Sequence, residues 1–147
     1  MSKIRINIGR VLVWILVVMA LLLSTIRYVN VVREMRMMSL YVEYLEEATR
    51  KFQSFSSSRD LNEYWDGVSD YNSAVRLVQT EGKKTDIYEE SETLLAVQGI
   101  LNHSPLWAQD NINELLDALS RIILNPTVRV SYVDLLNFYN KFNYGFK

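Results

Sequence analysis

The 147-residue sequence contains no cysteine, one histidine and two prolines. Without cysteine the chain forms no disulfide, offers no thiolate nucleophile and builds no cysteine-ligated zinc site. The same lack favours a bacterial or phage origin over a secreted animal one. Its five glycines stand singly, so there is no glycine-rich phosphate loop and no dinucleotide-binding fingerprint. Several large enzyme classes are therefore excluded at the outset.

The titratable side chains also give little sign of catalysis. The one histidine, His103, would need an oriented nucleophile and a third group to act as a base, and the adjacent Ser104 is better explained as a helix cap. The clustered acidic side chains are explained more simply as solvent-exposed residues on helix faces than as ligands of a metal ion. The sequence therefore predicts no enzyme, no cofactor and no metal site. The strongest metal candidates are Glu43, Glu46, Asp66 and Asp70.

One long hydrophobic run is present near the N-terminus. Residues 11–26 read VLVWILVVMALLLSTI, sixteen positions without a charged side chain. At 1.5 Å per residue they span roughly 24 Å, and flanking arginines can reach outward to match the ~30 Å hydrocarbon core of a bilayer. The sequence predicts a transmembrane anchor over residues 11–32. Its marker residues are Val11, Trp14, Leu16, Leu22 and Ile26.

Basic residues bracket this run. Residues 1–36 carry a net charge of +5 in a chain of net charge −1, so the remainder carries −6. Arginines and lysines beside an apolar helix bind anionic lipid headgroups, whereas an acidic folded part repels nucleic acid. The lipid bilayer is the expected partner, residues 1–10 are the expected basic tail, and no nucleic acid is expected. The expected headgroup contacts are Lys3, Arg5, Arg10, Arg27, Arg33 and Arg36.

Three alternatives compete with an anchor: a buried core helix, a cleaved signal peptide and a mitochondrial presequence. Leucine, valine and isoleucine of this density are unusual in the core of so small a domain. No small-x-small cleavage pattern follows the run before Arg27, and the run is too hydrophobic for a presequence. The positive-inside rule slightly favours a cytoplasmic N-terminus, with an exported C-terminal domain in the periplasm or outside the cell.

The residues after the anchor read as one continuing helix. Neither glycine nor proline occurs between Ile26 and Phe55, and helix-favouring residues are frequent there. The sequence predicts a helical stalk over residues 33–55. Apolar residues recur on it at three- and four-residue spacings, and nothing nearby identifies what covers them. We expect this stripe to be the interaction surface, with Met38, Tyr41, Val42, Leu45, Phe52 and Phe55 as its residues.

The remaining residues, 60–147, predict a helical soluble domain. The whole chain is thus expected to be all-α: an N-terminal transmembrane helix continuing into a stalk, followed by a small bundle of about four helices. Residues 56–58, three serines, predict a hinge before it. The helix boundaries expected from capping and breaking residues are Asp60 and Gly82 for the first helix, Thr85 for the start of the second, Ser104-Pro105 and Asn125-Pro126 for the third, and about Ser131 to Asn143 for the last.

A few residues carry sharper expectations. Gly67 and Gly99 stand inside predicted helices at a cost of about 1 kcal/mol each relative to alanine, which predicts close helix packing there or a helix boundary. Trp65 and Tyr71 are expected in the core. Val128–Val133 could alternatively form a short strand, although nothing else in the chain offers it a partner.

The layout of an N-terminal anchor followed by helices resembles that of bacterial LemA-like proteins and of phage spanins. Residues Tyr71-Asn72-Ser73-Ala74-Val75 are similar to a LemA-type Tyr-Asn-x-x-Val step, but the surrounding residues do not follow that pattern. The resemblance is one of layout and assigns the chain to no family.

Two functional hypotheses follow from the sequence. The first is a non-enzymatic, membrane-anchored interaction or assembly subunit that docks another membrane protein or self-associates. The second is an oligomeric membrane-acting effector, of a phage or bacterial lysis, exclusion or defence type. Such an effector would need several copies, because one apolar helix cannot line a water path.

Overall fold

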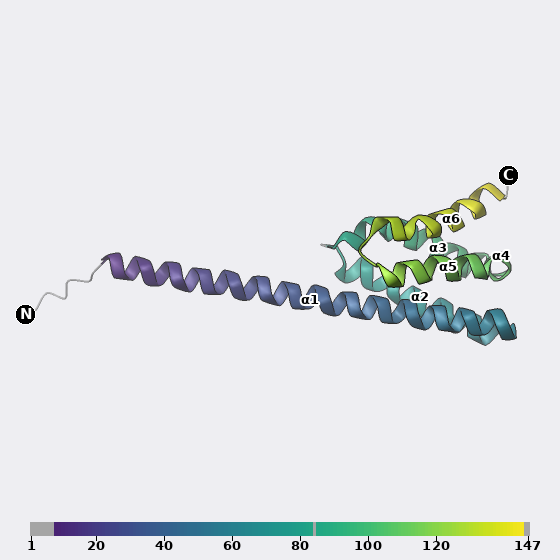
Figure 1. Ribbon diagram of the computed structural model, residues 1–147, viewed down its shortest axis with the longest axis horizontal. Coiled ribbons are helices and arrows are strands. Elements are labelled where there is room, and N and C mark those ends of the chain that lie inside the picture. Colours follow the sequence, from purple (N-terminus) through teal and green to yellow (C-terminus); the bar gives the residue numbers. More distant parts are fainter. Residues whose placement is uncertain (1–7, 84, 146–147) are drawn as a thin grey trace, which may run out of the picture. The chain divides into compact units, whose positions relative to one another are not determined.

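The computed structural model describes residues 8–83 and 85–145 (Figure 1). Within these ranges every regular element is a helix, which confirms the predicted all-α class. The elements are α1 (Ile8–Ser58), α2 (Leu61–Glu81), η1 (Asp86–Glu90), α3 (Ser91–His103), α4 (Pro105–Asp110), α5 (Ile112–Leu124), η2 (Arg129–Tyr132) and α6 (Val133–Gly145), where η marks a 3-10 helix.

The chain divides into two compact units after Met35. In the first unit, residues 9–35 of α1 are all exposed. The second unit, Arg36–Lys147, holds a hydrophobic core whose first buried member is Met37. The predicted domain start at residue 60 is therefore wrong. Residues 37–58 are the first helix of the bundle, and they are not a stalk outside it.

The apolar stripe predicted as an interaction surface lies in this core. Its larger side chains pack on α2: the rings of Phe52 and Phe55 lie 5.9 and 5.4 Å from the ring of Tyr64, measured between centroids. Because the chain's own helices cover the stripe, the expectation that a partner must cover it is wrong. Tyr41, Leu45, Phe52 and Phe55 are at most 2% exposed, and Met38 and Val42 are partly buried against the same core.

The turn between α1 and α2 differs from the predicted serine hinge. The serines remain helical, and the hydroxyls of Ser57 and Ser58 donate hydrogen bonds to the carbonyls of Gln53 and Ser54. The chain reverses at Arg59, which has a φ of +58°. Asp60 then caps α2 as predicted, since its carboxylate accepts a hydrogen bond from the Asn62 N–H.

The later boundaries follow the predictions with local changes. Gly82 ends α2, but with a φ of −78°, so it does not use the left-handed conformation available to glycine. The helix predicted from Thr85 begins as η1 and becomes α3 only at Ser91. Pro105 occupies the first turn of α4 as predicted, although the Ser104 side chain makes no capping hydrogen bond.

The helix predicted between Ser104 and Asn125 is interrupted at Asn111. The side-chain amide of Asn111 donates a hydrogen bond to the Trp107 carbonyl at 2.8 Å. The backbone φ of Asn111 is −108°, which lies outside the helical range. An asparagine side chain that bonds the local backbone competes with the helix in this way. The interruption separates α4 from α5. Further along, residues 129–132 form η2, so the alternative of a strand is wrong.

The two helical glycines lie in opposite environments. A Cβ atom on Gly67, in α2, would lie 2.8 Å from the Phe52 Cδ1 and Cε1 atoms, whereas one on Gly99, in α3, would meet nothing within 4 Å. Close packing is therefore confirmed at Gly67 and wrong at Gly99. The Phe52 ring is fully buried, so it has little room to give way.

These environments predict opposite effects of the same substitution. Gly67→Ala should lower the free energy of unfolding by up to about 2 kcal/mol, because overpacking costs about 1–3 kcal/mol and exceeds the helix-propensity gain of about 1 kcal/mol. Gly99→Ala should raise it by up to about 1 kcal/mol, since only the propensity gain remains. Urea unfolding of the full chain in detergent micelles measures both. Equal signs for the two variants would contradict the packing at Gly67.

Candidate functional site

The exposed apolar part of α1 is the most distinctive surface of the chain. Its most apolar window has a mean hydropathy of 2.3, and none of that window is buried. Among the described residues, α1 is the one helix that is long and apolar enough to cross a membrane. The alternative of a buried core helix is wrong, because none of the described residues buries this window of the run. The anchor residues Val11, Trp14, Leu16, Leu22 and Ile26 are 45–69% exposed.

Arginines lie at both ends of the uncharged run, as the sequence indicated. Arg10, Arg27, Arg33 and Arg36 are all exposed. Lys3 and Arg5, also expected at the headgroups, lie outside the described residues. Within the run, the Thr25 hydroxyl donates to the Leu21 carbonyl at 2.9 Å. This bond satisfies the hydroxyl within the helix.

Between Arg27 and the first core residue, α1 remains apolar and uncovered. Tyr28, Val29, Val31, Val32 and Met35 are 39–71% exposed. On a helix these residues fall within one broad face, opposite the side that carries Arg27, Asn30 and Glu34. This segment is amphipathic, in contrast to the wholly apolar run before it.

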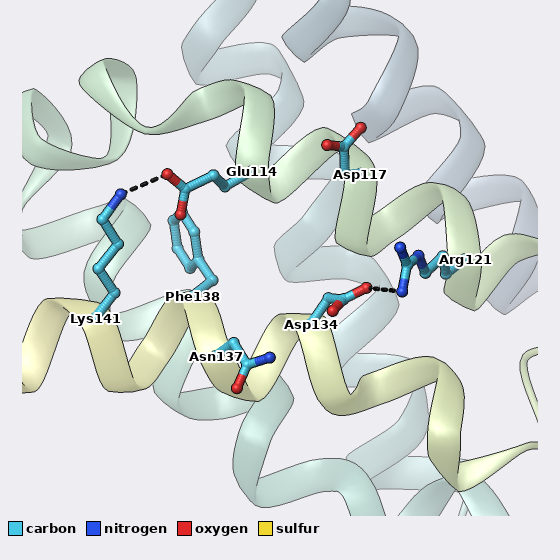
Figure 2. Close-up of a pocket in the computed structure, with 7 residues that line it drawn as sticks. All are labelled: Glu114, Asp117, Arg121, Asp134, Asn137, Phe138 and Lys141. Atoms are coloured by element: carbon cyan, nitrogen blue, oxygen red, sulfur yellow. Dashed lines mark hydrogen bonds and ion pairs between the residues drawn. The ribbon is translucent and has the colours of Figure 1, made fainter.

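A polar groove lies between α5 and α6 on the surface of the domain (Figure 2). It has a volume of about 330 Å³ and the buried ring of Phe138 at its base. Ion pairs join the two helices at either end, Lys141 with Glu114 and Arg121 with Asp134. Its lining residues are Glu114, Asp117, Arg121, Asp134, Asn137, Phe138 and Lys141.

The charged residues of this groove pair with one another and hold α5 and α6 together. Its three carboxylates and two cations leave a net charge of −1, and each cation is already paired. Lys141 Nζ also donates to the Asn111 Oδ1 atom at 2.8 Å. Exposed pairs of this kind contribute roughly 0–1 kcal/mol each. The paired residues are 13 and 27 positions apart in sequence. Charge patterns within one helix reveal only pairs three or four residues apart.

Of the four carboxylates considered for a metal ion, Asp66 pairs with a lysine instead. Lys51 Nζ lies 3.7 Å from carboxylate oxygens of both Glu63 and Asp66. Burial and the nearby Glu47 raise the pKa of Asp70, the next carboxylate along α2. No group of three or more histidines, aspartates or glutamates with metal-binding geometry occurs among the described residues. His103 ends α3 on the exposed surface.

Four buried tyrosines bring hydroxyl groups into the core. Tyr64 and Tyr71 donate to the carbonyls of Leu101 and Leu94, each at 3.0 Å, and so tie α2 to α3. The Tyr132 hydroxyl donates to the Pro126 carbonyl at 2.8 Å and lies 3.2 Å from the Tyr41 hydroxyl. Since Tyr132 has one proton to give, Tyr41 must donate to Tyr132. This relay fastens the α5–α6 connection to α1.

Of the two aromatic residues predicted to lie in the core, one is buried and the other is not. Tyr71 is fully buried, as expected, whereas Trp65 is 45% exposed and is therefore not the core residue predicted. Tyr41, which the sequence allowed on the surface, is completely buried. Periodicity placed Tyr41 and Trp65 on apolar faces, but it did not show how far each face is covered.

The buried tyrosines predict a loss of stability at alkaline pH. Burial raises the pKa of Tyr132 to about 12 and raises the pKa values of Tyr41 and Tyr71 well above their ordinary value. Unfolded tyrosines ionise near pH 10, so the stabilisation is fully present below that pH and is lost as pH rises toward about 12. Above about pH 10, each of these buried tyrosines lowers the free energy of unfolding by about 1.4 kcal/mol for every further pH unit.

Urea unfolding of the full chain at several pH values between 9 and 12 (roughly, the window set by these ionisations) measures this slope. Tyr71→Phe should make the slope shallower by the contribution of one proton. A free energy of unfolding that stays constant across the window would contradict the burial of these hydroxyls.

Comparison with protein-family models, with curated protein sequences and with solved structures gave no match to this chain.

Proposed function

We propose that this chain is a non-enzymatic, single-pass membrane protein whose helical domain docks another membrane protein or a second copy of itself. The observation that carries the proposal is the apolar part of α1, which stays unburied among residues 8–83 and 85–145. Water-exposed apolar surface of this extent is unfavourable, and a bilayer removes it from water.

The composition of the run gives the size of this effect. Residues 11–26 contain eleven leucines, isoleucines and valines. Each contributes about 0.3–0.6 kcal/mol to membrane insertion near the centre of a helix, which sums to about 3–7 kcal/mol. Serine and threonine at positions 24 and 25 subtract little, because the Thr25 hydroxyl is bonded within the helix.

The character of the domain supports an interaction role over catalysis. The charged side chains that it brings together are engaged with one another, as at Lys141–Glu114, Arg121–Asp134 and Lys51. Its four buried tyrosine hydroxyls are each bonded to a carbonyl or to another hydroxyl. Groups used in this way hold helices together and are not poised for proton transfer or nucleophilic attack.

A combined measurement of membrane integration and assembly tests the proposal. The full chain should resist extraction by alkaline carbonate, float with membranes, and run in detergent as an oligomer or together with another membrane protein. Light scattering of the purified detergent complex gives the number of copies. A strictly monomeric particle that captures no partner would contradict the assembly role, and extraction by carbonate would contradict the anchor.

For the orientation, we propose an exported C-terminal domain, on the balance of basic residues around the run. Single cysteines at Ser2→Cys and at Ser57→Cys, which is exposed at the end of α1, report the two sides, since the chain has no other cysteine. An impermeant maleimide applied to intact cells or spheroplasts should label position 57. Labelling of position 57 only after the membrane is opened would reverse the orientation.

A further inference from the structure

The connection between α5 and α6 exposes an unusual amount of apolar side chain. Leu124 and Val130 are each 76% exposed, and Val128 and Val133 are each 47% exposed. The backbone around them is held in place, because Tyr132 donates to the Pro126 carbonyl and contacts Tyr41 through its hydroxyl. Exposed apolar side chains that gather on one part of a surface are candidates for a contact site.

The position of this connection in the domain is well defined. The Tyr41–Tyr132 contact, 3.2 Å between hydroxyls, places it beside the first turns of the part of α1 that belongs to the domain. At the other end of that part of α1, the Ser56 hydroxyl donates to Asn113 at the start of α5. Figure 1 accordingly shows the α5–α6 connection and α4 at opposite ends of the bundle. The connection therefore lies at the end of the domain where the chain arrives from the anchor.

Chain length keeps that end of the domain close to the bilayer. The domain begins at Arg36, nine residues after Arg27, the first charged residue beyond the apolar run. Nine residues span roughly 14 Å as a helix and at most about 32 Å when fully extended. The interfacial layer on each side of the hydrocarbon core is itself about 5–8 Å thick. The first residue of the domain therefore lies within about 32 Å of Arg27, whatever path the segment takes.

The segment between the anchor and the domain shortens this distance further. Five of the eight residues from 28 to 35 are apolar and uncovered by the domain, Tyr28 at 71% and Met35 at 60% exposure among them. Burial of these apolar side chains in lipid is favourable. Because α1 is continuous from Ile8 to Ser58, this burial shortens the part of the helix that separates Arg36 from the bilayer.

We propose that the α5–α6 connection is a second membrane-contact site, which inserts Leu124, Val128 and Val130 into the lipid interface. The inference rests on the proposed membrane anchor. The charges at this end are mixed: Arg129 lies on the connection, and Asp86, Glu89 and Glu90 lie on η1, which packs against η2. The contact is therefore apolar in character and does not require anionic lipid.

Site-specific fluorescence on the full chain tests the contact. Val130→Cys and Leu106→Cys each carry one environment-sensitive label, in a chain without other cysteines, reconstituted into phosphatidylcholine vesicles with or without brominated acyl chains. Leu106 is the matched control, since it is 77% exposed against 76% for Val130 and lies on α4 at the opposite end of the bundle. The label at 130 should emit at shorter wavelength and lose several times more intensity to the brominated lipid than the label at 106.

A third label at Leu22→Cys separates this inference from the anchor itself. If position 22 is quenched by brominated lipid but positions 130 and 106 behave alike, the second contact is overturned while the anchor stands. If position 22 is not quenched and the chain does not float with the vesicles, the anchor fails, and the second contact fails with it. Blue-shifted emission at 130 without lipid quenching would assign the site to protein, such as a second copy, and would also overturn the lipid contact.

Discussion

Leu22→Arg is expected to move the chain out of the carbonate-resistant membrane fraction. Leu22 lies within the uncharged run and is 58% exposed, so no part of the protein can shelter an arginine there. On the insertion scale, replacing leucine by arginine near the centre of a helix costs about 3–4 kcal/mol. That loss is comparable to the total of about 3–7 kcal/mol available from the leucines, isoleucines and valines of the run. Membrane flotation followed by immunoblotting measures the remaining fraction.

Two controls make the result specific to the anchor. Leu22→Ala removes side-chain volume without adding charge and should leave most of the chain in the membrane. The helical domain begins only at Arg36, so Leu22→Arg should leave its unfolding transition unchanged. A chain that stays carbonate-resistant with an arginine at position 22 would mean that the run does not span the bilayer as a single helix.

Phe52→Ala is expected to unfold much of the helical domain. The Phe52 side chain is fully buried, packs against the Tyr64 ring and lies against the backbone of Gly67. Removing a buried phenylalanine ring typically costs about 3–5 kcal/mol. Since whole domains are stable by about 5–15 kcal/mol, this is a large share of the total. Urea unfolding of the full chain in detergent, followed by near-ultraviolet circular dichroism, measures the change.

This variant also distinguishes the two interpretations of the α1 stripe. If the stripe were a free docking surface, Phe52→Ala would weaken partner binding and leave the domain as stable as before. Leu106→Ala is the surface control: its side chain is 77% exposed, and its loss should change stability by less than about 0.5 kcal/mol. Equal stabilities for the Phe52 and Leu106 variants would restore the stripe as a candidate interaction surface.

Local sequence signals predicted the parts of the fold that depend on neighbouring residues. The apolar run predicted a long exposed helix, Asp60 predicted the start of α2, and Asn125-Pro126 predicted the end of α5. Each signal acts through the backbone within one or two turns, by capping, by removing an N–H donor or by helix propensity. No contact with a distant part of the chain is needed for any of them.

Other features needed the tertiary structure because they depend on contacts far apart in the sequence. The hydroxyls of Tyr41 and Tyr132 meet across 91 residues, and those of Tyr64 and Tyr71 reach carbonyls on the next helix. The groove between α5 and α6 is closed by ion pairs of the same non-local kind. Helical periodicity cannot reveal such pairs, since it describes one helix at a time.

The sequence by itself determined that the chain is helical and that two parts of α1, before and after Met35, each carry apolar side chains that must leave water. Only the tertiary structure decided what covers them. From Met37 onward the later helices bury the stripe, whereas residues 9–35 remain uncovered along their whole length. The physical reason is that the hydrophobic effect is non-directional: an apolar side chain leaves water equally well by packing on a neighbouring helix or by entering lipid. Only three-dimensional packing shows which helix faces the rest of the domain leaves uncovered.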